Sequence, residues 1–98
     1  LRAIALGHGD HLSLHVVRIR DREAPHVHAR HDLAVTLLDG EGELHLADRV
    51  AHMRPGDSAF VPAQVAHYFV NTGRGEAVAI VTFAPPLTAP DTVPARVE

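Results

Sequence analysis

The sequence predicts an all-β fold, and three observations support this prediction. Short segments rich in apolar and β-branched residues recur along the chain. Proline and glycine separate these segments, as they do at turns between strands. No stretch shows the 3.6-residue apolar period of an amphipathic helix. Short, evenly spaced strands favour a sandwich or a barrel, because these architectures bury or remove exposed sheet edges.

The first predicted strand runs from Leu12 to Arg20, where residue types alternate and β-branched residues are frequent. One of two sets of side chains faces the core: Leu12, Leu14 and Val16, or His15, Val17 and Ile19. The next segment, residues 21–32, is polar. Pro25 favours extended rather than helical backbone before His26, so we expect a strand edge or a loop there.

Turn residues predict how the middle of the chain is connected. Residues 33–38 form an apolar run, and the sequence Asp-Gly-Glu-Gly at 39–42 predicts a tight hairpin into a strand at 43–47. In that strand His45 is expected to face solvent. The strand at 50–54 should bury Met53 and expose His52, and the Pro-Gly-Asp turn at 55–57 ends it.

The remaining predicted strands are residues 58–61, 66–71 and 76–83. The tail from Pro85 to Glu98 has four prolines and no periodicity. It is either disordered or an extended arm that lies over the barrel or a neighbouring subunit, and we favour the arm. We expect residues 1–98 to form a single domain, with a core at about 12–86 and an extended tail at 87–98.

Composition excludes several classes of protein. The chain is 46% hydrophobic and 21% charged, which is typical of a folded domain. Its nine basic residues are scattered and the net charge is -3, so a nucleic-acid partner is not expected. No apolar run reaches the roughly 18 to 20 residues of a membrane span, and no signal peptide is apparent. The absence of cysteine fits a reducing compartment, so we expect a cytoplasmic protein.

Nine histidines are the unusual feature of this composition. His26 and His28 lie on the same side of an extended backbone, because side chains alternate along a strand, and they can therefore share one metal ion. His67 lies in a later predicted strand and can complete the site, with Asp32 as an oxygen ligand. The other candidates, apart from His31, are interpreted as surface or edge residues: His8, His11, His15, His45 and His52.

Two motifs resemble those of the cupin superfamily, over about residues 12–86. In the second motif, Gly56, Pro62, His67 and Asn71 fall at the family's positions, and Gln64 replaces the inner glycine. The first motif is matched by His26, His28, Asp32 and Gly40, whereas Arg20 stands at its leading glycine. The resemblance implies a double-stranded β-helix, also called a jelly roll or cupin barrel. For Asn71 a structural role, hydrogen-bonding a turn, is favoured.

The fourth metal ligand stays open, because two registers of one strand are possible. Counting back from Gly40 puts Leu33 at the family's glutamate, whereas counting forward from His28 reaches Asp32. The two registers turn opposite faces inward. If Asp32 faces inward it is the favoured ligand. If Leu33 does, the site has three histidines with a water, or it recruits His31.

The resemblance implies one divalent metal, and Zn, Fe, Mn, Ni and Cu all suit such ligands. A metal-free pocket in which the histidines bind a ligand directly is the alternative. The expected pocket walls are Val35, Leu37, Phe60 and Phe69. We expect a metal-dependent enzyme of dioxygenase, isomerase or lyase type acting on an oxygenated, chelating small molecule, with Asp32 and His31 as catalytic residues. A non-catalytic binding or sensing module is the second hypothesis. A homodimer is also expected, with the first strand or the tail reaching across.

Overall fold

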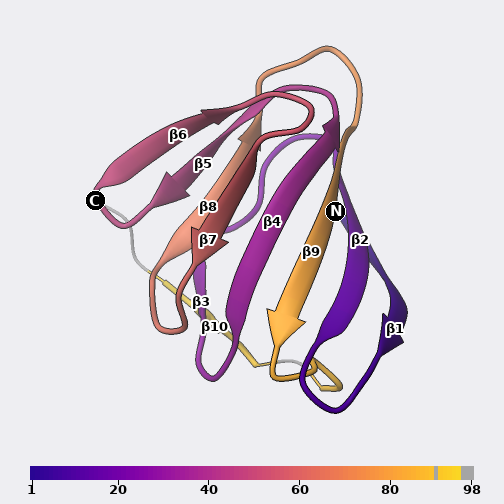
Figure 1. The fold of residues 1–98 in the computed structure, drawn as a ribbon. Coiled ribbons are helices and arrows are strands. Elements are labelled where there is room, and N and C mark those ends of the chain that lie inside the picture. Colours follow the sequence, from indigo (N-terminus) through magenta and orange to yellow (C-terminus); the bar gives the residue numbers. More distant parts are fainter. Residues whose placement is uncertain (90, 96–98) are drawn as a thin grey trace.

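Two antiparallel sheets face each other and enclose the core (Figure 1). The computed structural model describes residues 1–89 and 91–95, which contain strands and no helix. The strands are β1 (Arg2–His8), β2 (Ser13–Ile19), β3 (His26–His28), β4 (Asp32–Asp39), β5 (Gly42–Leu46), β6 (Arg49–Met53), β7 (Ser58–Val61), β8 (His67–Asn71), β9 (Ala77–Ala84) and β10 (Thr92–Pro94). The predicted jelly-roll barrel is confirmed.

The order of strands is β1-β2-β9-β4-β7 in one sheet and β10-β3-β8-β5-β6 in the other. Residues far apart in sequence therefore become neighbours, such as β2 beside β9 and β3 beside β8. Within the described part of the chain, no helix is long and apolar enough to cross a membrane.

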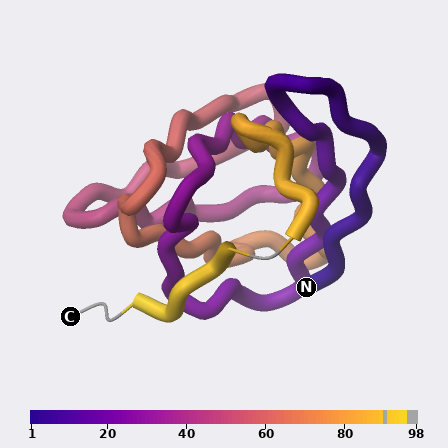
Figure 2. The backbone as a smooth tube through the Cα atoms, turned by 90° about the horizontal axis from the view of Figure 1, so that it is seen from below, coloured from indigo at the N-terminus to yellow at the C-terminus, as the bar shows by residue number. Residues whose placement is uncertain are grey.

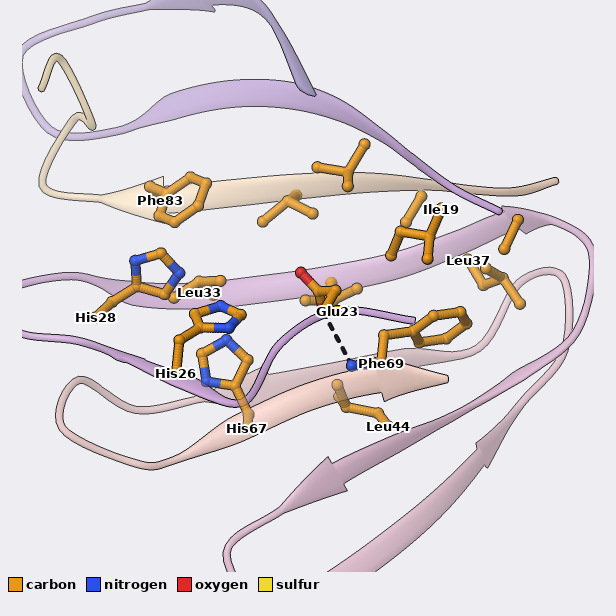
Figure 3. Close-up of a pocket in the computed structure, with 15 residues that line it drawn as sticks. Ile19, Glu23, His26, His28, Leu33, Leu37, Leu44, His67, Phe69 and Phe83 are labelled. Carbon is orange, nitrogen blue, oxygen red and sulfur yellow. Dashed lines mark hydrogen bonds between the residues drawn. The ribbon is translucent and has the colours of Figure 1, made fainter. Parts of the chain in front are cut away.

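Alternation along the strands decides which residues fill the barrel. In β9 the buried residues Ala77, Ala79, Val81 and Phe83 alternate with partly exposed ones. The buried hydrophobic core consists of Ile19, Leu33, Leu37, Leu44, Met53, Val61, Phe69, Ala77, Ala79, Val81 and Phe83. Phe83 lies near the histidines, with its ring centroid 5.1 Å from that of His28 (Figure 3).

The strand β2 has the second of its two predicted registers. Ser13, His15 and Ile19 are buried, whereas Leu12 and Leu14 are exposed. His15 is therefore a correction to its interpretation as a surface or edge residue: its ring packs edge-on against Phe83 and hydrogen-bonds Ser13. The predicted burial of Met53 and exposure of His52 are confirmed.

The predicted hairpin at residues 39–42 is wrong. β4 pairs with β7 and β9, while β5 pairs with β6 and β8 in the opposite sheet. The chain turns at Gly40, which has a φ of 91° and lies against Ala77, and then crosses between the sheets. Turn residues indicate where the chain reverses, but they do not determine which strand the next one pairs with.

The tail forms an extended arm on its own barrel. After β9 the chain turns back, and β10 pairs with β3. Figure 2 shows the yellow arm beside the purple β3 segment. Residues 90 and 96–98 of the predicted tail lie outside the described residues.

Candidate metal centre

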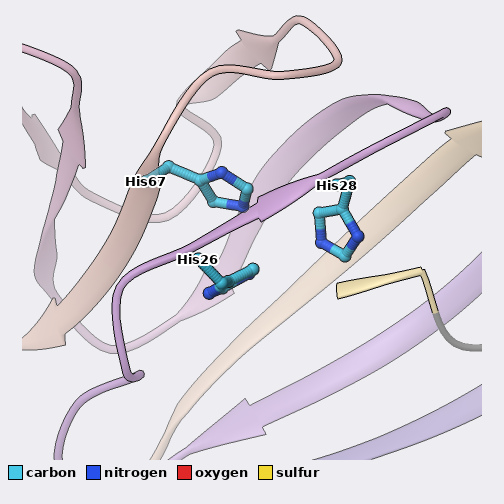
Figure 4. Close-up of side chains that lie close together, drawn as sticks. All are labelled: His26, His28 and His67. Carbon is cyan, nitrogen blue, oxygen red and sulfur yellow. The ribbon is translucent and has the colours of Figure 1, made fainter. Parts of the chain in front are cut away.

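Three histidines meet at one end of the barrel (Figure 4). His26 and His28 come from β3, and His67 is the first residue of β8. The pairing of these strands places His26 directly opposite His67. One ring nitrogen from each histidine lies within 4.8 Å of the other two, and His28 and His67 are buried.

Each of the three rings is held through its Nδ1 atom. His26 donates to the carbonyl oxygen of Ala24 at 2.7 Å, and His67 donates to that of Val65 at 3.0 Å. His28 donates to the carboxylate of Asp91 at 2.7 Å. Since a neutral imidazole carries one N–H, these bonds leave the Nε2 lone pair of each ring free. In metal-binding histidines, the ring nitrogen that does not bind the metal typically donates such a hydrogen bond.

Burial keeps two of these rings neutral. It lowers the pKa of His67 to about 4, despite the hydrogen bond to Val65, which raises it. Burial also lowers the pKa of His28, and Asp91 opposes that effect. A metal ion binds the neutral imidazole, so both rings are ready to bind one near neutral pH.

The donor set fits a divalent transition metal. Three imidazole nitrogens from two neighbouring strands suit Zn, Fe, Mn, Ni or Cu, and imidazole does not select among them. His26, His28 and His67 would therefore hold the ion.

The structure does not bring Asp32 to the three histidines, which corrects the sequence-based expectation. In β4 the buried side chains are Leu33 and Leu37, so Asp32 lies on the outer face. Its carboxylate is exposed and accepts the backbone N–H of Ala63 at 2.8 Å. The register counted back from Gly40 is therefore the one that the strand adopts.

His31 also lies apart from the three histidines. It is buried, its Nδ1 donates to Asp91, and its Nε2 faces the carbonyl oxygen of Pro86 at 3.3 Å. Both nitrogens point to these oxygens and not to the three histidines. Among the described residues, neither predicted fourth side chain joins the group.

An apolar cavity extends from the histidines into the barrel (Figure 3). Val35, Leu37 and Phe69 line it, as the sequence predicted. Phe60 does not, and this expectation was wrong: it is 62% exposed, because alternation in β7 buries Val61 and turns Phe60 outward. The cavity measures about 70 Å³, which holds one or two water molecules.

A larger groove adjoins the same histidines. It measures about 370 Å³, which lies within the usual range for small-molecule sites. His26, His28 and Glu23 line both spaces. The walls of the groove come from the start of the chain, the middle of β2 and the arm, including Ala3, His15, Leu87, Thr92 and Pro94.

Glu23 is a candidate functional residue that the sequence did not reveal. Figure 3 shows it between the histidines and Phe69, whose backbone N–H donates to Oε1 at 3.0 Å. Burial raises the pKa of Glu23, outweighing His26 and the Phe69 amide, which lower it. The only signal in the sequence is a carboxylate shortly before the paired histidines, in a segment without periodicity.

Gln64 and Asn71, two positions of the second motif, hydrogen-bond different parts of the backbone. Gln64, at the position of the missing motif glycine, has a φ of 72°, and its backbone N–H donates to the carbonyl oxygen of His28 at 2.9 Å. Left-handed backbone is the conformation that favours glycine there. The two N–H bonds of the Asn71 side chain are shared among the carbonyl oxygens of Ile19, Arg20 and Gly75, and its Oδ1 accepts the Gly73 N–H. Asn71 thus hydrogen-bonds a turn, as the sequence indicated.

Comparisons with known proteins agree with this geometry. A family model described as "Cupin domain" matches residues 14–83. An uncharacterised protein from Aquifex aeolicus is 37% identical over 98 residues, covering 100% of this chain and 78% of the relative.

Two solved structures have the same fold. KdgF from a Halomonas species is 26% identical, with a TM-score of 0.78 over 85% of this chain and 78% of KdgF. An uncharacterised Klebsiella pneumoniae protein with a double-stranded β-helix domain has a TM-score of 0.80 at 22% identity, covering 95% of this chain and 82% of its own, and supports the fold alone.

Proposed function

Because the chain belongs to the cupin domain family, we propose that it is a metal-dependent enzyme that acts on a small oxygenated molecule. The observation that carries this proposal is the convergence of three histidines. Each of them donates its Nδ1–H to an oxygen and keeps the lone pair of its Nε2 free. A bound divalent ion would supply Lewis-acid polarisation of a substrate oxygen.

The groove, rather than the inner cavity, suits the substrate. The cavity of about 70 Å³ is too small for more than water-sized groups, whereas the groove of about 370 Å³ reaches His26 and His28. No arginine or lysine is among the described residues that line the groove. The described lining of the groove therefore offers no cationic side chain to a phosphate group, so we favour an uncharged hydroxy-carbonyl compound whose oxygens chelate the metal.

Glu23 is the residue we propose for proton transfer. One carboxyl oxygen accepts the Phe69 N–H, which leaves the other on the wall shared by cavity and groove. Its raised pKa brings a carboxylic acid closer to neutral pH, where it can both donate and accept a proton. This favours isomerase or lyase chemistry over oxygen chemistry. Asp32 and His31 do not fit the catalytic role, because neither lines the cavity or the groove.

The test begins with metal analysis of protein purified without a histidine tag. We expect about one divalent ion per chain, lost in His26→Ala and His67→Ala. The loaded protein is then incubated with a panel of small hydroxy-carbonyl compounds in deuterated water, and solvent deuterium at substrate carbon is followed by NMR, with oxygen uptake measured in parallel.

Each outcome separates one class of function from another. Deuterium incorporation that requires both metal and Glu23 supports isomerase or lyase chemistry, and oxygen uptake without it indicates a dioxygenase. Retained metal with ligand-induced stabilisation and no turnover would instead favour a non-catalytic binding or sensing module. Absence of metal from the wild-type protein, even after incubation with divalent ions, would overturn the proposal.

A further inference from the structure

The C-terminal arm is attached to the strand that carries two of the three histidines. In the β10–β3 pair, Thr92 lies opposite His28 and Pro94 lies opposite His26. Beyond the pair, the Ala95 N–H donates to the carbonyl oxygen of Pro25 at 3.0 Å. Docking of the arm and the position of the His26–His28 backbone therefore depend on the same hydrogen bonds.

Asp91, which directly precedes β10, connects the arm to the histidines through its side chain. It is 8% exposed. Its carboxylate accepts the Nδ1–H of His28 at 2.7 Å, the Nδ1–H of His31, and the backbone N–H of Arg30 at 3.2 Å. A buried carboxylate is costly unless such donors surround it, so these bonds must form together when the arm docks.

We infer that Asp91 is a positioning residue for the metal, and that metal binding and docking of the arm stabilise each other. Asp91 holds the His28 ring so that Nε2 faces His26 and His67. An ion on Nε2 withdraws electron density from the ring, which makes the Nδ1–H a stronger donor to Asp91. Thermodynamic linkage between two binding events is reciprocal. If the arm orients His28 for the metal, the arm is itself held more firmly when His28 is bound to the metal.

Coupling between metal binding and docking of the arm also affects the shape of the groove. Leu87, Thr92 and Pro94 of the arm form part of the groove in which we place the substrate. Metal binding would therefore also complete the wall of the groove. The inference rests on the proposed metal site, and it assigns to the arm a role in that site's affinity and shape.

The first test compares the metal affinity of two carboxylate variants. Asp91→Asn keeps the shape of the side chain and removes its charge, and we expect the Kd for Zn²⁺ to rise about 10- to 100-fold. Asp32→Asn is the matched control, because Asp32 is exposed and bonds only the Ala63 backbone among the described residues. Its Kd should stay within about twofold of the wild type. Titration calorimetry measures both, after circular dichroism has established that each variant folds.

The second test reads the arm itself. The Ala95 amide should exchange with deuterium at least about fivefold more slowly in the Zn²⁺-loaded wild type than in the chelator-treated protein, and Asp91→Asn should remove this difference. Equal Zn²⁺ affinity of Asp91→Asn and wild type, or metal-independent exchange at Ala95 in the wild type, would overturn the inference while the proposed function stood. A wild type that binds none of Zn²⁺, Ni²⁺ and Mn²⁺ would overturn the proposed function and this inference together.

Discussion

His67 links the histidine cluster to the stability of the metal-free protein. Its folded pKa is about 4, whereas an unfolded histidine titrates near 6.5. As pH falls from 6.5 to 4 the unfolded chain binds a proton at this position before the folded chain does. Stability from His67 is therefore fully present above pH 6.5 and is lost as pH falls through that window, with a slope of at most about 1.4 kcal/mol per pH unit.

Chelator-treated wild type and His67→Gln should therefore differ in the slope of unfolding free energy against pH, measured by urea denaturation between pH 4 and 7. Glu23 acts in the opposite direction, because burial raises its pKa, and His15 and His28 act in the same direction as His67. These three groups are present in wild type and variant alike, so the difference between the slopes is assigned to His67. Parallel slopes would show that the His67 ring is not desolvated as the structure has it.

Glu23 can be tested by a change that keeps its hydrogen bond. In Glu23→Gln the amide oxygen can still accept the Phe69 N–H, but the side chain no longer exchanges a proton. We expect kcat to fall at least about 100-fold with metal affinity unchanged within about twofold. Glu43→Gln is the control, because Glu43 lies beside His45, away from the cavity lining. Full activity in Glu23→Gln would exclude the proton-transfer role.

At the residue scale, local spacing predicted part of the site and long-range contacts supplied the rest. The alternation of one short strand is enough to put His26 and His28 on one side. Asp91 bonds His28 from an irregular, proline-rich tail 63 positions away, and such a contact leaves no periodic signal. Glu23 was missed for a related reason, since its direction depends on one hydrogen bond to β8.

Gly42 is a position in β5 where a strand tolerates only glycine. A Cβ there would lie 1.9 Å from the Phe69 ring, which packs directly over the backbone. Gly42→Ala should therefore destabilise the protein by about 1 to 3 kcal/mol, because Phe69 must move. Gly7→Ala, in β1, is the control: nothing lies within 4 Å of its added Cβ, and the change should stay within about 0.5 kcal/mol.

Thermal denaturation of the two glycine variants measures this effect. The backbone amide of Phe69 also holds Glu23. Gly42→Ala should therefore in addition weaken the binding of any ligand in the groove. A Gly42→Ala protein as stable as Gly7→Ala would mean that β5 and β8 are less closely packed than the structure has them.

At the element scale, strand existence was predictable and strand partnership was not. The predicted segments at 58–61 and 66–71 nearly coincide with β7 and β8, because alternation and turn residues are local. The register of β4 could not be decided from spacing alone, since Asp32 and Leu33 satisfy two different counts. Burial decides it: turning Leu33 outward would also expose Leu37 and place Asp32 and Thr36 on the core side.

For the whole molecule, the exposed edge of β1 is the basis on which we propose that two copies of the chain associate. All of its residues are exposed, including Ile4 at 56% and Leu6 at 55%, and its outer backbone edge has no partner within the described chain. An apolar edge strand invites pairing with another chain. The tail is bound to its own β3. The first predicted strand is β2, which lies inside its sheet between β1 and β9. β1, which the sequence did not predict, is thus the better candidate for reaching a second copy.

We therefore propose a homodimer in which β1 of one copy packs against β1 of another, and we expect light scattering to give twice the chain mass at micromolar concentration. Ile4→Lys should yield a monomer, because the buried ammonium would lack a partner. Val50→Lys is the matched control, since Val50 is 51% exposed on β6, an edge of the other sheet. A monomeric wild type would refute assembly. A monomer produced by Val50→Lys alone would move the interface to β6, away from the groove that β1's end of the barrel helps to form.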